Sequence, residues 1–348
     1  MARLQQALIC ERKKLITAGV VIYTIVFHFV YNYYLKENVV FHSGVQRIIS
    51  SIWNLKSRSY GTEEMHTVAN AFELDVHLEH PILGHAGEVS GENHSTHIIQ
   101  FNVTTIAIGG GVTSKRVPGV NESNIAAKFQ LFNVFLPTFC RTASPGYDYR
   151  FYFAYDVNDP VFTNATLHAA FQKTFTSETK RLCDDPRNIT SSLHMVQCSH
   201  TGKPTWAQND AMLEAYLDHV DYFYRINDDT KMQTRGWAEA FITALNRYNP
   251  PRIGVVGPKH TGGNTNILTY DFVHRTHVDI FGFYYPRIFT DWFADDWVTV
   301  VYRPDRSTKL SNIKLAHTLG LGQRYKHNPS LGKKLPGQLK HDTAILKR

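Results

Sequence analysis

The sequence predicts an α/β fold, with a mostly parallel sheet flanked by helices and preceded by one membrane-spanning helix and a stem. Between residues 97 and 256, apolar segments rich in β-branched and aromatic side chains alternate with longer segments of helical periodicity. This alternation is typical of strand–helix–strand units, which build parallel sheets covered by helices. Upstream, residues 15–35 form an apolar run without a charged side chain, long enough to cross about 30 Å of hydrocarbon as a helix.

The flanks of the apolar run predict its orientation. Arg3 and the basic run 12–14 precede it, which favours a cytosolic N-terminus. No small-residue cleavage site follows at the usual spacing, so we expect a retained anchor and not a removed signal peptide. A buried core helix is the alternative, which the length, position and flanks of the run disfavour. We therefore expect a cytosolic tail over 1–14, an anchor over 15–35, and a type II protein of the Golgi or endoplasmic reticulum membrane.

The remaining chain divides by texture. Residues 36–95 show weak periodicity and are interpreted as a stem, residues 96–330 as the folded domain, and residues 331–348 as a basic polar tail. The expected strands span 97–108, 149–155, 192–197, 221–226 and 252–256, and the expected helices span 123–137, 165–180, 206–219 and 234–247. Ligands bind beyond the carboxyl ends of the strands in sheets of this kind.

Five N-glycosylation sequons follow the apolar run and none precedes it, which agrees with a luminal domain. They begin at Asn93, Asn102, Asn121, Asn164 and Asn188. Asn102 falls within an expected strand and is therefore expected to stay unmodified.

The charge distribution and the cysteines indicate which partners and which cellular compartment to expect. The formal net charge is +7, but the basic residues are scattered or gathered at the two ends, so we expect no nucleic-acid partner. Cys10 lies before the apolar run, and Cys140, Cys183 and Cys198 lie after it. Cys183 and Cys198 are close enough in sequence to close a short disulfide loop in an oxidising compartment, which leaves one cysteine unpaired. Their spacing does not match a zinc site.

Two adjacent carboxylates, Asp228 and Asp229, follow the strand expected over 221–226. Because like charges repel, a fold that places both at a strand end usually holds a cation between them. Oxygen ligands of this kind suit Mg²⁺ or Mn²⁺. The structural alternative is that Asp229 caps the helix expected to begin near Thr234.

In this context, Asn227-Asp228-Asp229 resembles the signature of the GT-A fold nucleotide-sugar glycosyltransferases, in which Asp-any-Asp ends a hydrophobic strand. The resemblance covers roughly residues 98–328 by the order of elements. It implies that Asp229, with Asp228, binds Mn²⁺ or Mg²⁺ and that the ion bridges the diphosphate of a donor, which we expect to be a UDP-sugar. Asn227 departs from the signature, since an amide carries no charge, and is expected to contact the ribose or to coordinate through its carbonyl oxygen.

The resemblance also implies a late histidine that completes the metal site. His317 follows an expected strand and is the first choice, with His327 as the second.

A second acidic cluster, Asp295-Asp296, lies between Trp292 and Trp297. Inverting sugar transfer needs a carboxylate that takes the proton of the acceptor hydroxyl. Flanking tryptophans would exclude water, raise the carboxylate pKa and offer apolar faces to a sugar ring. By resemblance, we expect Asp296 to be the base and Asp295 to bind acceptor hydroxyls. The alternative is a solvated helix N-terminus with both tryptophans as core anchors.

Polar residues after other strand ends are weaker candidates. Asp156 either contacts the uracil or ribose of a nucleotide or caps a turn. Lys259 and His260 are expected to face the donor diphosphate or the acceptor. The remaining candidates are Thr113, Ser114 and Lys115 for the nucleotide, and His274, Arg275 and His277 for the acceptor.

The sequence therefore predicts a membrane-anchored, metal-dependent and inverting glycosyltransferase that acts on a hydroxyl of a glycan, protein or lipid. Two alternatives remain. A non-catalytic luminal binding or scaffold protein is favoured by Asn227 in the first position of the signature. A metal-dependent hydrolase would require more His and Asp ligands to hold two metals.

Overall fold

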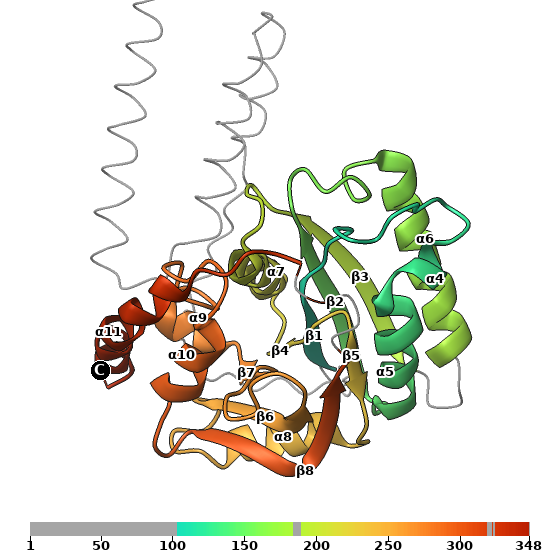
Figure 1. The fold of residues 1–348 in the computed structure, drawn as a ribbon. Helices are drawn as coiled ribbons and strands as arrows, with labels where there is room; N and C mark the ends of the chain where they lie inside the picture. Colours follow the sequence, from blue (N-terminus) through green and yellow to red (C-terminus); the bar gives the residue numbers. More distant parts are fainter. Residues whose placement is uncertain (1–102, 184–188, 319–321, 323, 348) are drawn as a thin grey trace, which may run out of the picture. The chain divides into compact units, whose positions relative to one another are not determined.

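The chain divides into two units, residues 1–99 and 100–348, and the second is described here. The computed structural model describes residues 103–183, 189–318, 322 and 324–347 (Figure 1). The expected cytosolic tail, anchor and stem lie outside these residues. Among the described residues, no helix is both long enough and apolar enough to cross a membrane.

An eight-stranded mixed sheet forms the centre of the domain, in the order β3-β2-β1-β4-β7-β6-β8-β5. The strands are β1 (Thr104–Gly111), β2 (Tyr147–Tyr155), β3 (Thr190–Gln197), β4 (Tyr222–Arg225), β5 (Thr230–Met232), β6 (Val255–Thr261), β7 (Phe272–His274) and β8 (Ser307–His317). Strands β3, β2, β1 and β4 are parallel neighbours, β8 is parallel to β6, β7 is antiparallel to β4 and β6, and β5 is antiparallel to β8. The expected α/β fold with a mostly parallel sheet is confirmed.

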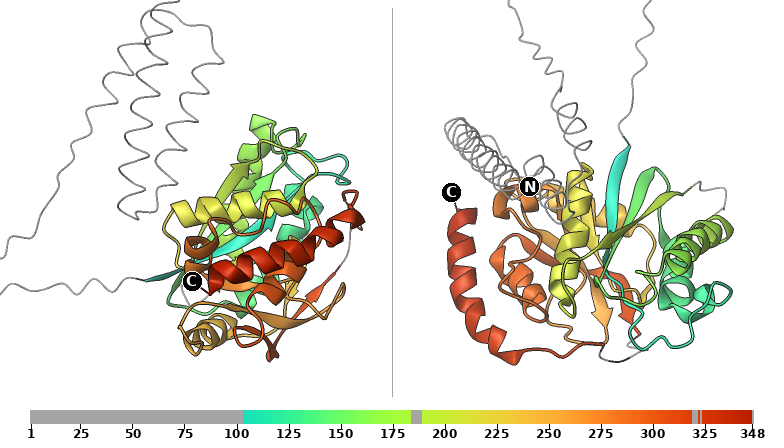
Figure 2. Two further views of the ribbon diagram at one scale, coloured as in Figure 1. Left: turned by 90° about the vertical axis from the view of Figure 1, so that its left-hand side faces the viewer. Right: turned by 90° about the horizontal axis from the view of Figure 1, so that it is seen from above.

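Helices cover both faces of the sheet (Figures 1 and 2). One apolar core lies under α4 (Ile125–Lys128), α5 (Leu136–Thr142), α6 (Ala165–Cys183) and α8 (Trp237–Asn246). The other lies under α7 (Pro204–Leu217), α9 (Thr276–Phe281), α10 (Ala294–Val301) and α11 (Leu335–Leu346). Because both faces are covered, the central strands are apolar throughout and do not alternate.

Strand β4 shows how the pleat serves both cores. Tyr222 and Tyr224 point into the first core, whereas Phe223 points into the second. The indole of Trp237 packs on Tyr224 with ring centroids 5.1 Å apart. The strand is therefore packed on both sides from Tyr222 to Tyr224, a few residues before the acidic pair.

Glycines let the backbones at the centre of the sheet approach closely. A Cβ on Gly110 would lie 2.7 Å from the carbonyl oxygen of Ile226, just past β4. The run Gly109–Gly111 was expected to end its strand, but it pairs with β2 as part of β1. The close approach explains why glycine stands inside a strand here.

Several element boundaries differ from the expectations. The helix expected over 123–137 is divided into α4, a π-helical turn (Leu131–Phe135) and α5. The strand expected over 252–256 begins at Val255 and runs to Thr261. The segment 331–348, expected as a polar tail, contains the end of a 3₁₀ helix (Pro329–Lys334) and all of α11, which packs on α9 and α10. A buried carboxylate explains this docking, because Asp342 of α11 accepts a hydrogen bond from Trp297 Nε1 at 2.9 Å.

Two of the five sequons lie in the described residues. Asn121 and Asn164 are exposed, and each uses its side-chain oxygen as a local acceptor, from Ser123 N and Leu167 N respectively. The sequons at 93, 102 and 188 lie outside the described residues.

The disulfide differs from the short loop that the spacing suggested. Cys140 of α5 bonds to Cys183 at the end of α6, and Cys198 is free and buried. The pairing follows from α5 packing on α6, which brings together two cysteines 43 residues apart. Spacing alone favours near neighbours, while bonding requires adjacent Cα positions.

We expect the Cys140–Cys183 disulfide to stabilise the domain by about 4 kcal/mol, since it closes a long loop in the unfolded chain. The Cys140→Ala/Cys183→Ala double variant should show this loss in the free energy of unfolding by urea. Cys198→Ser, which removes a thiol outside the disulfide, is the matched control for replacing a cysteine. Equal stability of the double variant and the wild type would contradict the assignment.

Candidate functional site

The acidic pair lies at the carboxyl end of β4, in a tight turn that leads into β5. Asn227 N donates to Thr230 Oγ1 and Thr230 N donates to Asn227 O, both at 3.1 Å. The turn buries both carboxylates, with Asp228 2% and Asp229 4% exposed. The helix-cap alternative is wrong, because α8 begins only at Trp237 and is preceded by Gly236.

His317 is brought to Asp229 by strand pairing. Antiparallel pairing of β5 and β8 places His317 opposite Thr230, the residue after Asp229. The Nε2 atom of His317 lies 3.2 Å from Asp229 Oδ2 and 3.5 Å from Asn227 Nδ2. Three residues that the sequence singled out therefore meet at one point.

One oxygen of this cluster has no partner. Asp229 Oδ1 is buried and makes no hydrogen bond to any described residue. Burial by itself would raise the pKa of Asp229, but the hydrogen bond and charge of His317, with the charge of Arg324, outweigh it and hold that pKa below its usual value. Asp229 is therefore ionised near neutral pH with one oxygen unused.

Arg324 is the residue that sequence analysis missed. Its guanidinium binds Asp228 in a bidentate ion pair, with Nη1 to Oδ2 at 2.8 Å and Nη2 to Oδ1 at 2.6 Å. The pair raises the pKa of the guanidinium against the opposing effect of burial. No pattern in the sequence signalled this contact, because the two residues are 96 positions apart. Asp228 thus faces an arginine, whereas Asp229 faces a histidine.

The second acidic cluster opens α10. Asp295 and Asp296 occupy its first turn and are partly buried. Asp295 Oδ2 accepts a long hydrogen bond from Thr269 Oγ1 at 3.4 Å. Burial, and next the charge of Asp295, raise the pKa of Asp296 above its usual value. Asp295 is thus anchored by a hydrogen bond, whereas Asp296 is a partly buried carboxyl group with a raised pKa.

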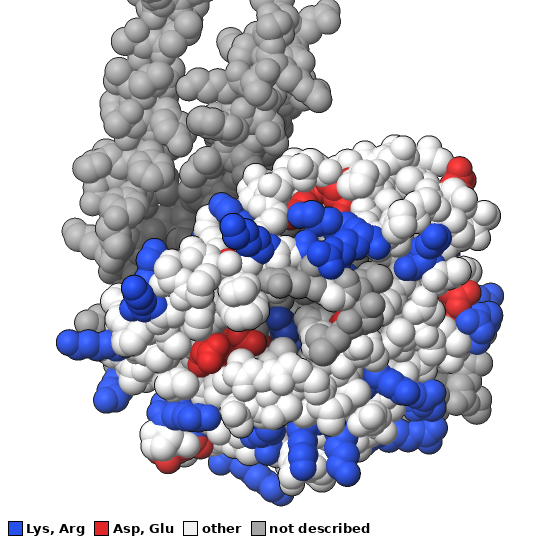
Figure 3. All heavy atoms as spheres, viewed as in Figure 1, with Lys and Arg blue, Asp and Glu red and all other residues white. Residues whose placement is uncertain are grey.

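A buried arginine lies between the two acidic clusters. Arg225, the last residue of β4, is 8% exposed and donates from Nη1 to the carbonyl oxygen of Thr269. The charges of Asp295 and Asp271 both act on it. Tyr325 lies in the same environment, since the charges of Arg225 and Asp295 both act on the pKa of its phenol group. The clusters therefore border one polar region, and the face shown in Figure 3 is hollowed near its centre, where acidic and basic side chains meet.

The two tryptophans around the second cluster have different environments. Trp297 is fully buried and is a core anchor, so it offers no face to a sugar ring. Trp292 is 45% exposed and stacks on His327, with ring centroids 3.9 Å apart. His327, the second choice for the metal site, is thus the stacking partner of Trp292.

The weaker candidates separate in the same way. Asp156 Oδ2 accepts a hydrogen bond from Gly202 N at 2.9 Å, as a turn cap would. Lys259 is exposed on β6, whereas His260 is 3% exposed. Thr113 and Ser114 both donate to Asp159, which explains their position without a nucleotide.

The histidines expected at the acceptor site belong to the core. His277 is 1% exposed, with Tyr302 Oη 2.8 Å from Nδ1 and the Tyr284 carbonyl oxygen 2.8 Å from Nε2. His274 of β7 is 8% exposed. Burial lowers the pKa of both to about 4. Their expected role in acceptor binding is therefore wrong.

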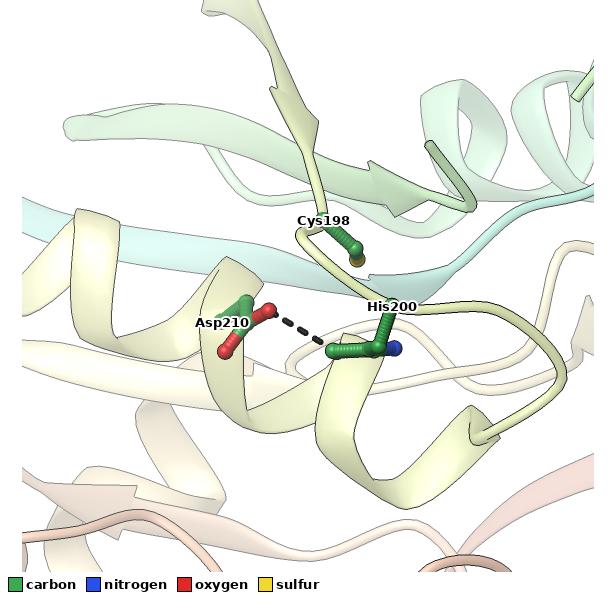
Figure 4. A group of neighbouring side chains, drawn as sticks. All are labelled: Cys198, His200 and Asp210. Carbon is green, nitrogen blue, oxygen red and sulfur yellow. Dashed lines mark hydrogen bonds and ion pairs between the residues drawn. The ribbon is translucent and has the colours of Figure 1, made fainter. Parts of the chain in front are cut away.

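A third polar cluster follows β3 (Figure 4). Cys198, His200 and Asp210 offer ligand atoms within 4.8 Å of one another, and His200 Nε2 lies 3.0 Å from Asp210 Oδ2. Arg287 also donates to Asp210 at 3.1 Å and balances its charge. Burial, and next Asp210, raise the pKa of the Cys198 thiol, so it stays protonated. Because the thiol is protonated and the carboxylate already pairs with an arginine, we interpret the cluster as a link between β3 and α7.

Comparisons with known proteins add little to this geometry. No family model matches the sequence, and no curated protein matches it. Among solved structures, a crystal structure of S. aureus TarS is similar at 13% sequence identity and a TM-score of 0.40. The match covers 70% of this chain and 42% of the TarS chain, so this chain spans less than half of that protein. At that distance the likeness carries no argument about activity.

We expect His277 to make the fold sensitive to acid. Its pKa in the folded protein, about 4, lies below the ordinary histidine pKa of about 6.5. Between these two pH values the imidazole is protonated in the unfolded chain and neutral in the folded protein. Stability should therefore fall as the pH drops from about 6.5 to about 4, by about 1.4 kcal/mol per pH unit for this group.

The variant His277→Gln keeps a donor and an acceptor but does not titrate, so its unfolding free energy should fall less steeply over this range. His219→Asn, which removes an exposed histidine, is the matched control and should keep the wild-type slope. An unchanged slope in His277→Gln would contradict the assignment.

Proposed function

We propose that this domain is a metal-dependent glycosyltransferase that moves a sugar from a nucleotide-diphosphate donor, a UDP-sugar, to an acceptor hydroxyl with inversion. The observation that carries the proposal is the unpartnered, buried Oδ1 of Asp229 beside His317 at the carboxyl end of a parallel strand. Buried polar atoms are nearly always paired, so an unpaired carboxylate oxygen at a ligand-binding edge favours a bound cation. The GT-A resemblance of Asn227-Asp228-Asp229 supports the same site.

The residues present fit a divalent ion. Asp229 offers a carboxylate and His317 an imidazole nitrogen. Asn227 turns its amide nitrogen toward His317, so its amide oxygen would become a ligand only after the amide group rotates. This mixed oxygen and nitrogen set suits Mn²⁺ better than Mg²⁺, which prefers oxygen ligands and water. When bound, the ion would neutralise the developing charge of the departing diphosphate.

Arg324 gives Asp228 a role different from that of a metal ligand. Its guanidinium is already held beside the acidic pair by two charge-assisted hydrogen bonds. Arginine presents a planar fork that recognises phosphate oxygens. In this proposal Asp228 orients Arg324, and Arg324 contacts the donor diphosphate beside the ion. Lys259 and Asp156 are proposed to contact the phosphates and the nucleoside.

Asp296 is proposed to be the general base. Its raised pKa and partial burial suit a group that must accept a proton near neutral pH. As the acceptor oxygen bonds to the anomeric carbon, the hydroxyl proton passes to the Asp296 carboxylate and the bond to the diphosphate breaks. Asp295, anchored by Thr269, would orient the acceptor hydroxyls.

The cellular setting is also proposed. The Cys140–Cys183 disulfide is typical of an oxidising compartment, which agrees with a luminal domain in the Golgi or endoplasmic reticulum. The acceptor would then be a glycan, glycoprotein or glycolipid of the secretory pathway.

A non-catalytic binding protein is the second candidate. The bidentate pair of Arg324 with Asp228 supports it, because this contact stabilises one of the two buried acids without a cation. Such a protein would bind no nucleotide in a metal-dependent way, which separates it from the enzyme.

Replacing Asp229 tests the metal site. Asp229→Asn should weaken Mn²⁺-dependent UDP binding by more than about 100-fold, since even indirect partners of metal ligands change affinity 10- to 100-fold. Calorimetry with UDP, with and without Mn²⁺, measures the effect. Asp305→Asn changes an exposed carboxylate before β8 and is the matched control. Undiminished Mn²⁺-dependent binding in Asp229→Asn would exclude this ligand, and no such binding in wild type would favour the non-catalytic candidate.

Replacing Asp296 tests the base. Asp296→Asn should lower turnover by about 10²- to 10⁴-fold while UDP binding persists, because the amide cannot accept the proton. Turnover is measured as UDP release from a panel of UDP-sugars, with water or an added glycoside as acceptor. Release at the wild-type rate would rule out Asp296 as the base.

A further inference from the structure

Trp292 and His327 form an exposed, stacked aromatic pair just before α10. Their rings are nearly parallel, at 7°, with centroids 3.9 Å apart. Trp292 is nevertheless 45% exposed. Because His327 covers one face of the indole, the exposed area belongs to the opposite face and the edge. Part of the Trp292 side chain that does not stack on His327 is therefore open to solvent.

Asp291 holds the two rings of this pair in position. Asp291 Oδ1 accepts hydrogen bonds from Trp292 N at 2.7 Å and from Asn328 N at 3.1 Å, so one carboxylate ties together the two segments that carry the rings. Asp291 Oδ2 accepts from Thr290 Oγ1 at 2.9 Å. Asp291 is thus a positioning residue, and the aromatic face is preorganised.

The backbone at Phe293, the residue after Trp292, is strained. Phe293 has a φ of +75°, which is unfavourable for a bulky side chain. Its ring packs on Gly332, where a Cβ would lie only 2.9 Å away. Strain of this kind persists where packing enforces it and is concentrated at functional sites.

The aromatic pair adjoins both halves of the proposed active site. Trp292 lies just before α10 and precedes Asp296, which stands in the first turn of that helix, by four residues. His327 follows Arg324 by three residues, and Arg324 binds Asp228. The short segment 324–328 therefore links Asp228, which binds Arg324, to His327 and its stacking partner Trp292.

We propose that Trp292, backed by His327, binds a pyranosyl residue of the acceptor, with the apolar C–H face of the sugar on the indole. The assignment of this sugar as the acceptor rests on the proposed transferase function, whereas binding of a sugar to the indole does not. A protein partner would require a contiguous apolar patch. Among the described residues, the other large exposed hydrophobics are aliphatic and none is aromatic: Val103, Val157, Ile288 and Val300.

Saturation-transfer NMR on the full-length protein tests this subsite with methyl β-D-galactopyranoside, methyl β-D-glucopyranoside and methyl α-D-mannopyranoside. We expect binding of at least one glycoside, with the strongest transfer to the protons of one ring face. Trp292→Ala should weaken that binding about tenfold, and Trp292→Phe should keep most of it. Val300→Ala, an exposed apolar change on α10, is the matched control and should leave binding unchanged.

Absence of binding by all three glycosides, or equal binding in Trp292→Ala with an unchanged melting temperature, would overturn the proposal. Calorimetry with UDP and Mn²⁺ on the same samples separates it from the proposed function. Glycoside binding through Trp292 without UDP binding would support the sugar subsite and contradict the proposed transferase function. UDP binding without glycoside binding would contradict the sugar subsite and leave the proposed transferase function standing.

Discussion

The candidate site depends on how two adjacent, buried carboxylates are neutralised. An unpaired ion in a protein interior costs several kcal/mol, so neither acid at the end of β4 is stable there alone. Arg324 neutralises Asp228 by a bidentate contact, and His317 lies against Asp229. Both partners come from the far end of the chain. The acidic turn therefore requires β8 and the segment after it to return to the end of β4, and the mixed half of the sheet makes this possible.

The same constraint leaves the two acids in different states. Asp228 has both oxygens bound, whereas Asp229 keeps one buried oxygen without a partner. Arg225, which ends β4 just before this turn, is a buried positive charge on which the charge of Asp295 acts. A buried cation at this place would limit repulsion between the two acidic clusters while leaving specific carboxylate oxygens available to ligands.

Sequence patterns were most informative where one physical cause dominates. Strands buried on both faces are apolar along their whole length, so β2 and β4 were located within a few residues. Patterns failed where distant contacts decide. The helix expected over 123–137 is interrupted by a π-helical turn, and Cys183 pairs with Cys140 because α5 packs on α6, against the shorter spacing to Cys198.

The sequence by itself determined the α/β architecture and the position of both acidic clusters at the ends or starts of elements, because periodicity and strand-end chemistry are local properties. It also located His317 at the carboxyl end of a strand, although His317 is the last residue of β8 and does not follow it. Only the tertiary structure decided what each acid faces: Arg324 for Asp228, and His317 with an unpaired oxygen for Asp229. Tertiary structure likewise separated exposed Trp292 from buried Trp297. The physical reason is that burial and charge pairing depend on segments remote in sequence, which no local pattern encodes.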